Sequence, residues 1–213
     1  MIQNEYNRPP LWEIQERYAD RMRKWSHYYG IYTEYFEQFR GKEITVLEIG
    51  VDRGGSLEMW RDYFGPQARI AGLDIKRPEE VPEGVEIRKG DQGDIKFMQE
   101  LGEELKPDIV IDDGGHTMAQ QLISISALYH NTRSLYCVED THTSYFADYG
   151  GGLRFRGSFI EFAKESVDKL HAWFSRDKES LKPDQFTLTT TGIHFHDSLC
   201  IFEKGDHPGP KPL

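Results

Sequence analysis

The sequence has little cysteine and no long apolar run. Only Cys137 and Cys200 occur among 213 residues, and both lie inside apolar, strand-like segments. We therefore expect two buried thiols and no disulfide framework. No uncharged run approaches the ~20 residues that span a bilayer, and the first ten residues contain no apolar segment of a signal peptide. These absences predict a cytoplasmic protein with no membrane partner.

Basic residues are also few relative to acidic ones. The chain has 26 lysines and arginines against 36 aspartates and glutamates, which gives a formal net charge of −10. Binding to nucleic acid requires clustered basic side chains that neutralise phosphates, so we expect no nucleic-acid partner and favour a small-molecule substrate. At ~150 residues for an ordinary domain, the length predicts one domain.

Apolar and amphipathic segments alternate along most of the chain. Strands are expected at 44–49, 69–73, 85–88, 108–112, 135–138, 186–188 and 193–202, and helices at 55–64, 95–105, 117–129 and 158–174. This alternation predicts an α/β, Rossmann-like fold, with a mostly parallel seven-stranded sheet and helices on both faces. We divide the chain into an N-terminal helical segment (1–40), whose aromatic residues form core contacts, the main domain (41–204) and a surface tail (205–213). The stretch from His194 to Phe202 is interpreted as a hairpin at the sheet edge.

A glycine turn follows the first expected strand. Its glycines are Gly50, Gly54 and Gly55, so the spacing differs from the G-x-G-x-x-G that brings a backbone against a pyrophosphate. This argues against NAD or FAD. Acidic Glu48 and Asp52 favour a ligand that lacks phosphates and carries positive charge, as S-adenosylmethionine (SAM) does. The alternative is a turn with a purely steric role.

Polar residues at two further strand ends extend the predicted SAM site. Asp74 ends the second strand and is placed to accept hydrogen bonds from a ribose, while Asp91 and Gln92 follow the third strand and could reach the adenine. Each also has a simpler interpretation as a turn residue. The full set of expected cofactor-binding residues is Glu48, Gly50, Gly54, Ser56, Asp74, Asp91, Gln92 and Asp112.

Two acidic motifs follow the fourth and fifth expected strands. One contains Asp113 and the other contains Glu139 and Asp140. Adjacent parallel strands bring their carboxyl ends to one crevice, where carboxylates repel one another unless a cation or proton neutralises them. Oxygen ligands suit Mg²⁺ or Mn²⁺, so we infer a metal site made of Asp113, Glu139 and Asp140. The alternative is a set of separate caps and turn residues.

His116 lies three residues after Asp113 and can face the same crevice. Its unperturbed pKa of about 6.5 suits a general base near neutral pH. A sugar hydroxyl is too weak an acid to attack unaided, but metal coordination lowers the pKa of an oxygen acid. We therefore assign catalysis to His116 and Asp113, and we consider His142 a substrate contact or a residue that supports the metal ligands.

These motifs carry a resemblance to a known family. The segments Val46–Ser56, Gly90–Gln92, Ile111–His116 and Glu139–Tyr145 resemble the SAM- and Mg²⁺-dependent sugar O-methyltransferases of macrolide biosynthesis and the related proteins called cephalosporin hydroxylase-like. The resemblance covers most of residues 24–203. It implies a class I methyltransferase fold, metal binding by Asp113, Glu139 and Asp140, and His116 as the base. We expect the substrate contacts at His142 and Tyr145.

The resemblance indicates the catalytic residues better than it indicates the acceptor. The chain lacks the large N-terminal extension of those enzymes, so we expect a sugar or glycosylated small molecule as acceptor without identifying it. The alternatives are a catechol-type, metal-dependent O-methyltransferase and a SAM-binding accessory protein without turnover; an iron oxygenase is disfavoured. The aromatic N-terminal segment and the habits of the family suggest a homo-oligomer.

Overall fold

A computed structural model describes residues 9–76, 78, 81 and 83–211. Its centre is one seven-stranded sheet with the strand order β3-β2-β1-β4-β5-β7-β6. Five strands are mutually parallel, whereas β7 pairs antiparallel with both β5 and β6. The strands are β1 (Thr45–Ile49), β2 (Arg69–Asp74), β3 (Val85–Lys89), β4 (Ile109–Asp112), β5 (Leu135–Val138), β6 (Thr190–His196) and β7 (Leu199–Lys204). The expected fold class is confirmed.

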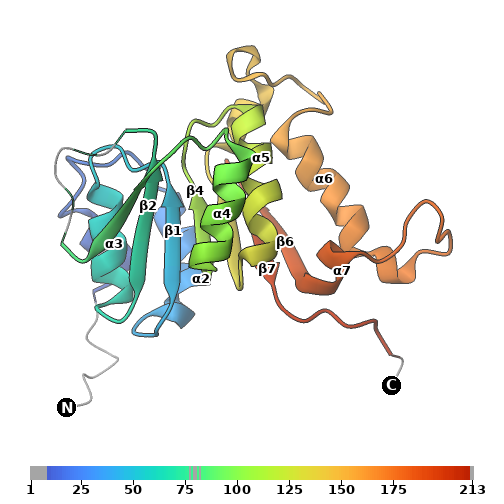
Figure 1. Ribbon diagram of the computed structural model, residues 1–213, viewed down its shortest axis with the longest axis horizontal. Coiled ribbons are helices and arrows are strands. Elements are labelled where there is room, and N and C mark those ends of the chain that lie inside the picture. Colours follow the sequence, from blue (N-terminus) through green and yellow to red (C-terminus); the bar gives the residue numbers. More distant parts are fainter. Residues whose placement is uncertain (1–8, 77, 79–80, 82, 212–213) are drawn as a thin grey trace.

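Helices cover both faces of this sheet (Figure 1). One face packs against α1 (Leu11–Gln15), α2 (Tyr28–Phe36) and α3 (Gly55–Phe64), and the buried Trp60 lies at the centre of an aromatic cluster with Tyr32 and Phe36. The other face packs against α4 (Ile95–Leu105), α5 (Met118–Leu128) and α6 (Phe159–Leu170). Both thiols are free and buried within this core, Cys137 on β5 and Cys200 on β7.

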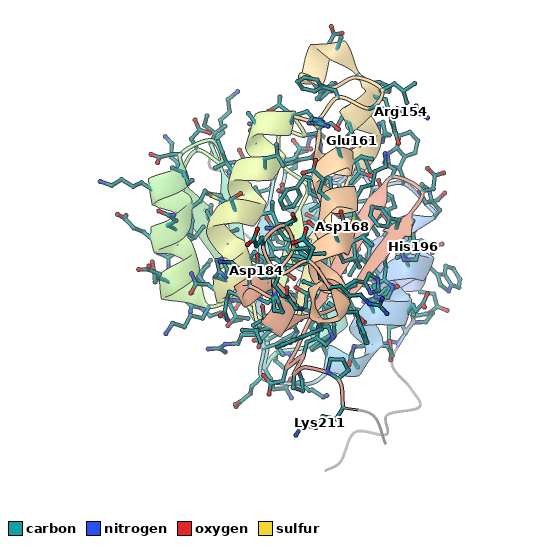
Figure 2. The ribbon with its side chains drawn as sticks, turned by 90° about the vertical axis from the view of Figure 1, so that its right-hand side faces the viewer. Arg154, Glu161, Asp168, Asp184, His196 and Lys211 are labelled. Atoms are coloured by element: carbon teal, nitrogen blue, oxygen red, sulfur yellow. The ribbon has the colours of Figure 1, made fainter. Side chains whose placement is uncertain are left out.

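Polar side chains fix where three of these helices begin. The Asp94 carboxylate accepts hydrogen bonds from the first backbone N–H groups of α4, Thr117 forms a reciprocal capping box with Gln120 at the start of α5, and Ser158 caps α6. Figure 2 faces α6 and shows Arg154 on the loop beyond the end of the helix that carries Glu161. Of these helices, α4 and α5 follow β3 and β4 after short turns, whereas α6 follows β5 after a longer loop.

The structure corrects two expected elements. Residues 186–188 are not a strand but lie in the short helix α7 (Gln185–Thr189), because the Asp184 carboxylate caps its first turn. The expected strand 193–202 is two strands, β6 and β7, which turn back at Asp197 and Ser198; the hairpin at the sheet edge is confirmed. The aromatic N-terminal segment also forms two helices, α1 and α2, and its residues 1–8 lie outside the described part.

The ends of the described chain are irregular. Residues 205–211 follow β7 and remain tied to the fold through the Trp173 indole N–H, which donates to the carbonyl of His207 at 3.1 Å. Within the described residues, no helix combines the length and the hydropathy needed to cross a membrane.

Lys204 generates a prediction about stability and pH. Its ammonium donates to the Tyr129 carbonyl and lies 4.3 Å from the centroid of the Tyr129 ring, and burial lowers the pKa of Lys204 to about 8. The unfolded chain, with a lysine pKa of about 10.4, therefore binds more protons than the folded chain between these values, so this contribution to stability rises with pH. Denaturant titrations should show the free energy of unfolding of wild type, relative to Lys204→Met, increasing from pH 7.5 to 9.5.

The exposed Lys96→Met is the matched control for the loss of one charge, and it should track wild type across the same range. A difference between wild type and Lys204→Met that does not change with pH would contradict the prediction.

Candidate active site

The glycine turn between β1 and α3 packs directly against the loop that follows β4. Gly50 has φ = 89°, and a Cβ built there would lie 2.0 Å from the carbonyl oxygen of Asp113. Only glycine allows both the left-handed backbone and this approach. The Asp74 carboxylate fixes the other side of the turn by accepting the N–H groups of Val51 (2.9 Å) and Asp52 (3.3 Å). The ends of β1, β2 and β4 are thus held together.

A cavity of about 470 Å³ opens at these strand ends. This size falls within the range of small-molecule sites, and the position outside the carboxyl ends of parallel strands is where α/β proteins bind ligands. Half of the site residues expected from the sequence lie on its wall, together with residues such as Lys24 that the sequence motifs do not indicate. The expected residues on the wall are Gly50, Ser56, Asp74, Asp91, Gln92, Asp113 and His116.

Three expected cofactor residues do not line this cavity. Glu48 is completely buried, and its carboxylate accepts hydrogen bonds from the Ser56 hydroxyl (2.6 Å) and the Trp60 indole (3.1 Å). Gly54, with φ = 83°, provides the left-handed residue from which α3 starts. Asp112 is buried at the end of β4. These residues shape the site from beneath its surface.

Gln92 connects two walls of the cavity. Its amide N–H donates to Asp112 Oδ1 at 2.6 Å, and its amide oxygen accepts the N–H of Gly115 at 3.0 Å. Burial raises the pKa of Asp112 to about 7, opposed by the hydrogen bonds that its carboxylate accepts. Gln92 therefore holds the loop between Asp112 and His116 in place, in addition to any contact with a ligand.

The acidic residues at the ends of β4 and β5 form two clusters that share Asp113. In one cluster, oxygen atoms of Glu48, Asp113 and Glu139 lie within 4.8 Å of one another. In the other, the same limit holds for ligand atoms of Asp113, His116 and Asp140. The expected metal set of Asp113, Glu139 and Asp140 is therefore divided between the two. Burial, together with the neighbouring Glu139 carboxylate, raises the pKa of Asp113 well above its usual value.

A lysine from the N-terminal segment fills the first cluster. Lys24 Nζ lies 2.6 Å from Glu139 Oε1, 2.8 Å from Asp113 Oδ2 and 3.1 Å from Glu48 Oε1, and only 1% of its side chain is exposed. Burial opposes its charge, but the carboxylates of Asp113, Glu139 and Glu48 raise the pKa of Lys24 well above its usual value. Lys24 therefore supplies one positive charge that three carboxyl groups share.

Aromatic residues of the same segment hold the two acids that follow β5. The Tyr32 hydroxyl donates to Glu139, while the Tyr28 hydroxyl (2.9 Å) and the Trp25 indole (3.0 Å) donate to Asp140 Oδ1. The aromatic spacing of this segment predicts core packing alone. The signal that could have indicated its second role is the lysine and tryptophan that directly precede a run of tyrosines, side chains with apolar bodies and polar tips.

His116 lies between the carboxylates of Asp113 and Asp140. Its Nε2 lies 3.5 Å from Asp140 Oδ2 and 3.8 Å from Asp113 Oδ1. Both His116 (φ = 56°) and Asp140 (φ = 52°) adopt the left-handed conformation that non-glycine residues rarely take, and such strain concentrates at functional sites. Burial lowers the pKa of His116 from 6.5, against the opposing Asp140 charge, so the imidazole is neutral at pH 7.

The residues expected to contact substrate lie at the outer edge of this arrangement. His142 forms a hydrogen bond with the Ser198 hydroxyl, and its ring lies edge-on to both Trp25 (6.3 Å) and Phe146 (5.4 Å). Tyr145 is about half exposed. His142 belongs to an aromatic rim beside Asp140 and does not line the cavity.

Comparison with known sequences finds relatives that are O-methyltransferases. No family model matches the chain. Its relatives include the 8-demethyl-8-(2-methoxy-alpha-L-rhamnosyl)-tetracenomycin-C 3'-O-methyltransferase of Streptomyces olivaceus and the mycinamicin VI 2''-O-methyltransferase of Micromonospora griseorubida, each 32% identical. The matches cover 92% and 93% of this chain but 54% and 53% of the relatives. The chain thus spans about half the length of the curated relatives it matches.

Solved structures give the same result for the fold. The methyltransferase MycE from the mycinamycin biosynthetic pathway, solved in complex with Mg and SAH, is 30% identical and has a TM-score of 0.86 over 94% of this chain and 56% of that one. A second structure of MycE also contains mycinamycin VI, with a TM-score of 0.85.

The sheet order and the cavity at the glycine turn define a Rossmann-like class I methyltransferase fold. Within that class, the chain is homologous to the sugar O-methyltransferases named above, over about half of their length.

The close approach at Gly50 can be tested by substitution. In Gly50→Ala, a methyl group would overlap the Asp113 carbonyl and the backbone would be strained, so the free energy of unfolding should fall by at least about 2 kcal/mol. Chemical denaturation measures this loss.

Gly30→Ala is the matched control, because Gly30 lies in α2 and a Cβ there meets no atom within 4 Å. Alanine should preserve stability at this position or raise it by up to about 1 kcal/mol. Equal stability of the two variants would show that the turn can move away from Asp113.

Proposed function

We propose that this protein transfers a methyl group from SAM to a hydroxyl group of a sugar or glycosylated small molecule, with Mg²⁺ or Mn²⁺ at the acidic cluster. The observation that carries the proposal is the position of His116. Its neutral imidazole lines the cavity at the glycine turn and faces the carboxylates of Asp113 and Asp140, in a chain homologous to sugar O-methyltransferases. A base, a candidate metal site and a cofactor cavity therefore meet at one point.

The chemistry of the cavity fits SAM. Asp74, at the end of β2, provides a carboxylate on the wall where a ribose diol needs acceptors. Asp91 and Gln92 supply polar groups at the end of β3 for an adenine edge, and the backbone at Gly50 leaves room for close approach of a ligand. The structure of MycE in complex with Mg and SAH supports SAM as the cofactor of this related chain.

The donor set also fits a divalent cation. Asp113 and Asp140 place carboxylate oxygens within 4.8 Å of each other, beside His116. Carboxylate oxygens are the ligands that Mg²⁺ and Mn²⁺ prefer. When bound, SAM supplies the electrophilic methyl group and the cation lowers the pKa of an acceptor hydroxyl.

His116 performs the proton transfer in this proposal. Its Nε2 accepts the proton of the acceptor hydroxyl, while Asp140, 3.5 Å away, stabilises the imidazolium that forms. Trp25 and Tyr28 fix the Asp140 carboxylate through its other oxygen, so the geometry is established before substrate arrives. We assign the sugar contacts of this proposal to His142 and Tyr145, which follow β5 near Asp140. The names of the two relatives specify glycosylated acceptors, which supports an acceptor of this kind here.

The direct test is calorimetric titration of SAM and of its demethylated product into chelated protein and into protein with Mg²⁺, followed by candidate diol sugars. We expect SAM to bind with a micromolar dissociation constant, and acceptor sugars to bind only when Mg²⁺ is present. Absence of SAM binding under both conditions would reject the proposed function.

His116→Asn should separate chemistry from binding. Removal of the general base should lower the rate of methyl transfer by about 100-fold to 10,000-fold, with little change in SAM affinity. The measurement is transfer of labelled methyl groups to a sugar acceptor under saturating SAM, with calorimetry for the affinity.

The exposed His130 is the matched control, and His130→Asn should retain the wild-type rate. Full activity of His116→Asn would favour the catechol-type alternative, because a phenolic acceptor is acidic enough to need little help from a base.

A further inference from the structure

Thr143 is a buried residue beside His116 that the proposed chemistry does not use. Its side chain is 3% exposed, and its hydroxyl lies 2.9 Å from the carbonyl oxygen of His116 and 2.8 Å from that of Asp140, each a hydrogen-bond acceptor. His116 follows β4 and Asp140 follows β5, so this one hydroxyl connects the loops that carry the proposed base and the carboxylate beside it. Thr143 itself does not line the cavity, so any effect on the chemistry passes through these two residues.

The His116 imidazole has no anchor at its second ring nitrogen. A histidine base is usually oriented by a group that forms a hydrogen bond with that nitrogen. Here Nε2 faces the carboxylates of Asp113 and Asp140, while Nδ1 is buried and forms no hydrogen bond with any other described residue. The position of the ring therefore depends on the backbone that carries it.

That backbone is held on both sides of the His116 Cα. Before it, the amide oxygen of Gln92 accepts the N–H of Gly115 at 3.0 Å, and a Cβ at Gly115 would overlap the amide oxygen of Gln120. After it, the His116 carbonyl meets the Thr143 hydroxyl. Because φ of His116 is 56°, the residue is strained, and such a conformation persists only where the surroundings impose it. Thr143 supplies this restraint at the carbonyl.

Asp140 is held by the same side chain. It also has a left-handed backbone, with φ = 52°, and it directly precedes the 3₁₀ helix η4 (Thr141–Tyr145). Residues three apart lie above one another in a 3₁₀ helix, which places Thr143 over Asp140. The Asp140 carbonyl accepts the backbone N–H of Thr143 at 3.0 Å. Since that carbonyl already has this partner, the single hydroxyl hydrogen of Thr143 is available to the His116 carbonyl.

The helix η4 is itself firmly attached to the rest of the fold. A Cβ at Gly151 would lie 2.7 Å from the carbonyl oxygen of Thr143 and would overlap that of Ser144, so the glycine-rich loop packs directly on η4. The Ser144 hydroxyl accepts the N–H of Ile160, in the first turn of α6, at 3.2 Å. Thr143 therefore projects from a fixed element toward the loop of the base.

We propose that Thr143 is a positioning residue for methyl transfer: its hydroxyl fixes the His116 backbone relative to that of Asp140 and so sets the distance between the imidazole and the Asp140 carboxylate. This inference rests on the proposed function for the role of His116 as the base. It goes beyond that function by naming a residue that touches neither substrate nor cofactor and acts through His116. A displacement of about 1 Å at a reacting group lowers a rate by about 100-fold, so the loss of this hydroxyl should be visible in turnover.

The first test is the transfer of labelled methyl groups from SAM to methyl α-L-rhamnoside, a sugar with vicinal hydroxyls. Thr143→Val keeps the shape of the side chain and removes the donor. It should lower kcat by about 10-fold to 100-fold, while the dissociation constant of SAM changes by less than about twofold. Thr143→Ser restores a hydroxyl and should recover most of the rate.

Thr132→Val is the matched control. The Thr132 hydroxyl is on a side chain that is also 3% exposed, and it donates to the carbonyl of Leu128 at 2.9 Å. Thr132 precedes β5, at the opposite end of that strand from the site. This variant loses the same kind of hydrogen bond, so it should lose a similar amount of stability and retain the wild-type kcat.

A double-mutant cycle separates an effect through His116 from a general loss of structure. In the His116→Asn background, where the base is already absent, Thr143→Val should change the rate by less than about twofold. An equal loss in both backgrounds would overturn the inference, and so would a wild-type kcat in Thr143→Val.

A further measurement needs no acceptor and decides the matter if the rhamnoside is not methylated. In protein with ¹³C-labelled histidine, the Cε1–H resonance of His116, identified by its loss in His116→Asn, should be single and sharp in wild type and in Thr132→Val. It should shift, broaden or split in Thr143→Val. An unchanged resonance in Thr143→Val would overturn the inference.

Failure of this inference is distinguishable from failure of the proposed function. Loss of activity in His116→Asn with a wild-type rate in Thr143→Val would remove only the role of Thr143. A wild-type rate in His116→Asn would instead reject His116 as the base, and the role of Thr143 with it.

Discussion

The fold of this protein depends on neutralising carboxylates that parallel strands bring to one edge. Glu48 on β1, Asp113 after β4 and Glu139 after β5 lie within 4.8 Å of one another, and Glu48 and Glu139 are almost completely buried. Uncompensated, such charges would destabilise the sheet that carries them. The Lys24 ammonium, the Tyr32 hydroxyl and the Trp60 indole supply the compensation. The N-terminal segment is thereby part of the site as well as part of the core.

This arrangement links stability to function. Tyr32 contributes an aromatic ring to the core cluster around Trp60 and a hydroxyl to Glu139, and Tyr28 performs the same two tasks for Asp140. A side chain with an apolar body and a polar tip can serve both purposes at once. The acids beside His116 are consequently held by rigid, packed groups, which is the kind of preorganisation that catalysis requires.

Several parts of the fold could be predicted because their signals are local. The alternation of apolar strands and amphipathic helices gave the α/β class, and the turn chemistry at Asp197 and Ser198 gave the edge hairpin. The strand predicted at 186–188 was wrong. Phe-Thr-Leu is typical of a strand, but the Asp184 cap and the packing of Phe186 on Tyr129 favour a helical turn. Local propensity is a weak signal where a cap and tertiary contacts oppose it.

The sequence by itself determined the class of fold and the strand ends at which chemistry takes place, because glycine spacing and strand-end acids are readable from neighbouring residues. It also pointed to Asp113, His116, Glu139 and Asp140 before their geometry was known. Only the tertiary structure decided how the acids are divided into two clusters and that Lys24, 89 residues before Asp113, fills one of them. Charge pairing over such a separation depends on how the chain folds back on itself, and that information is not contained in any local pattern.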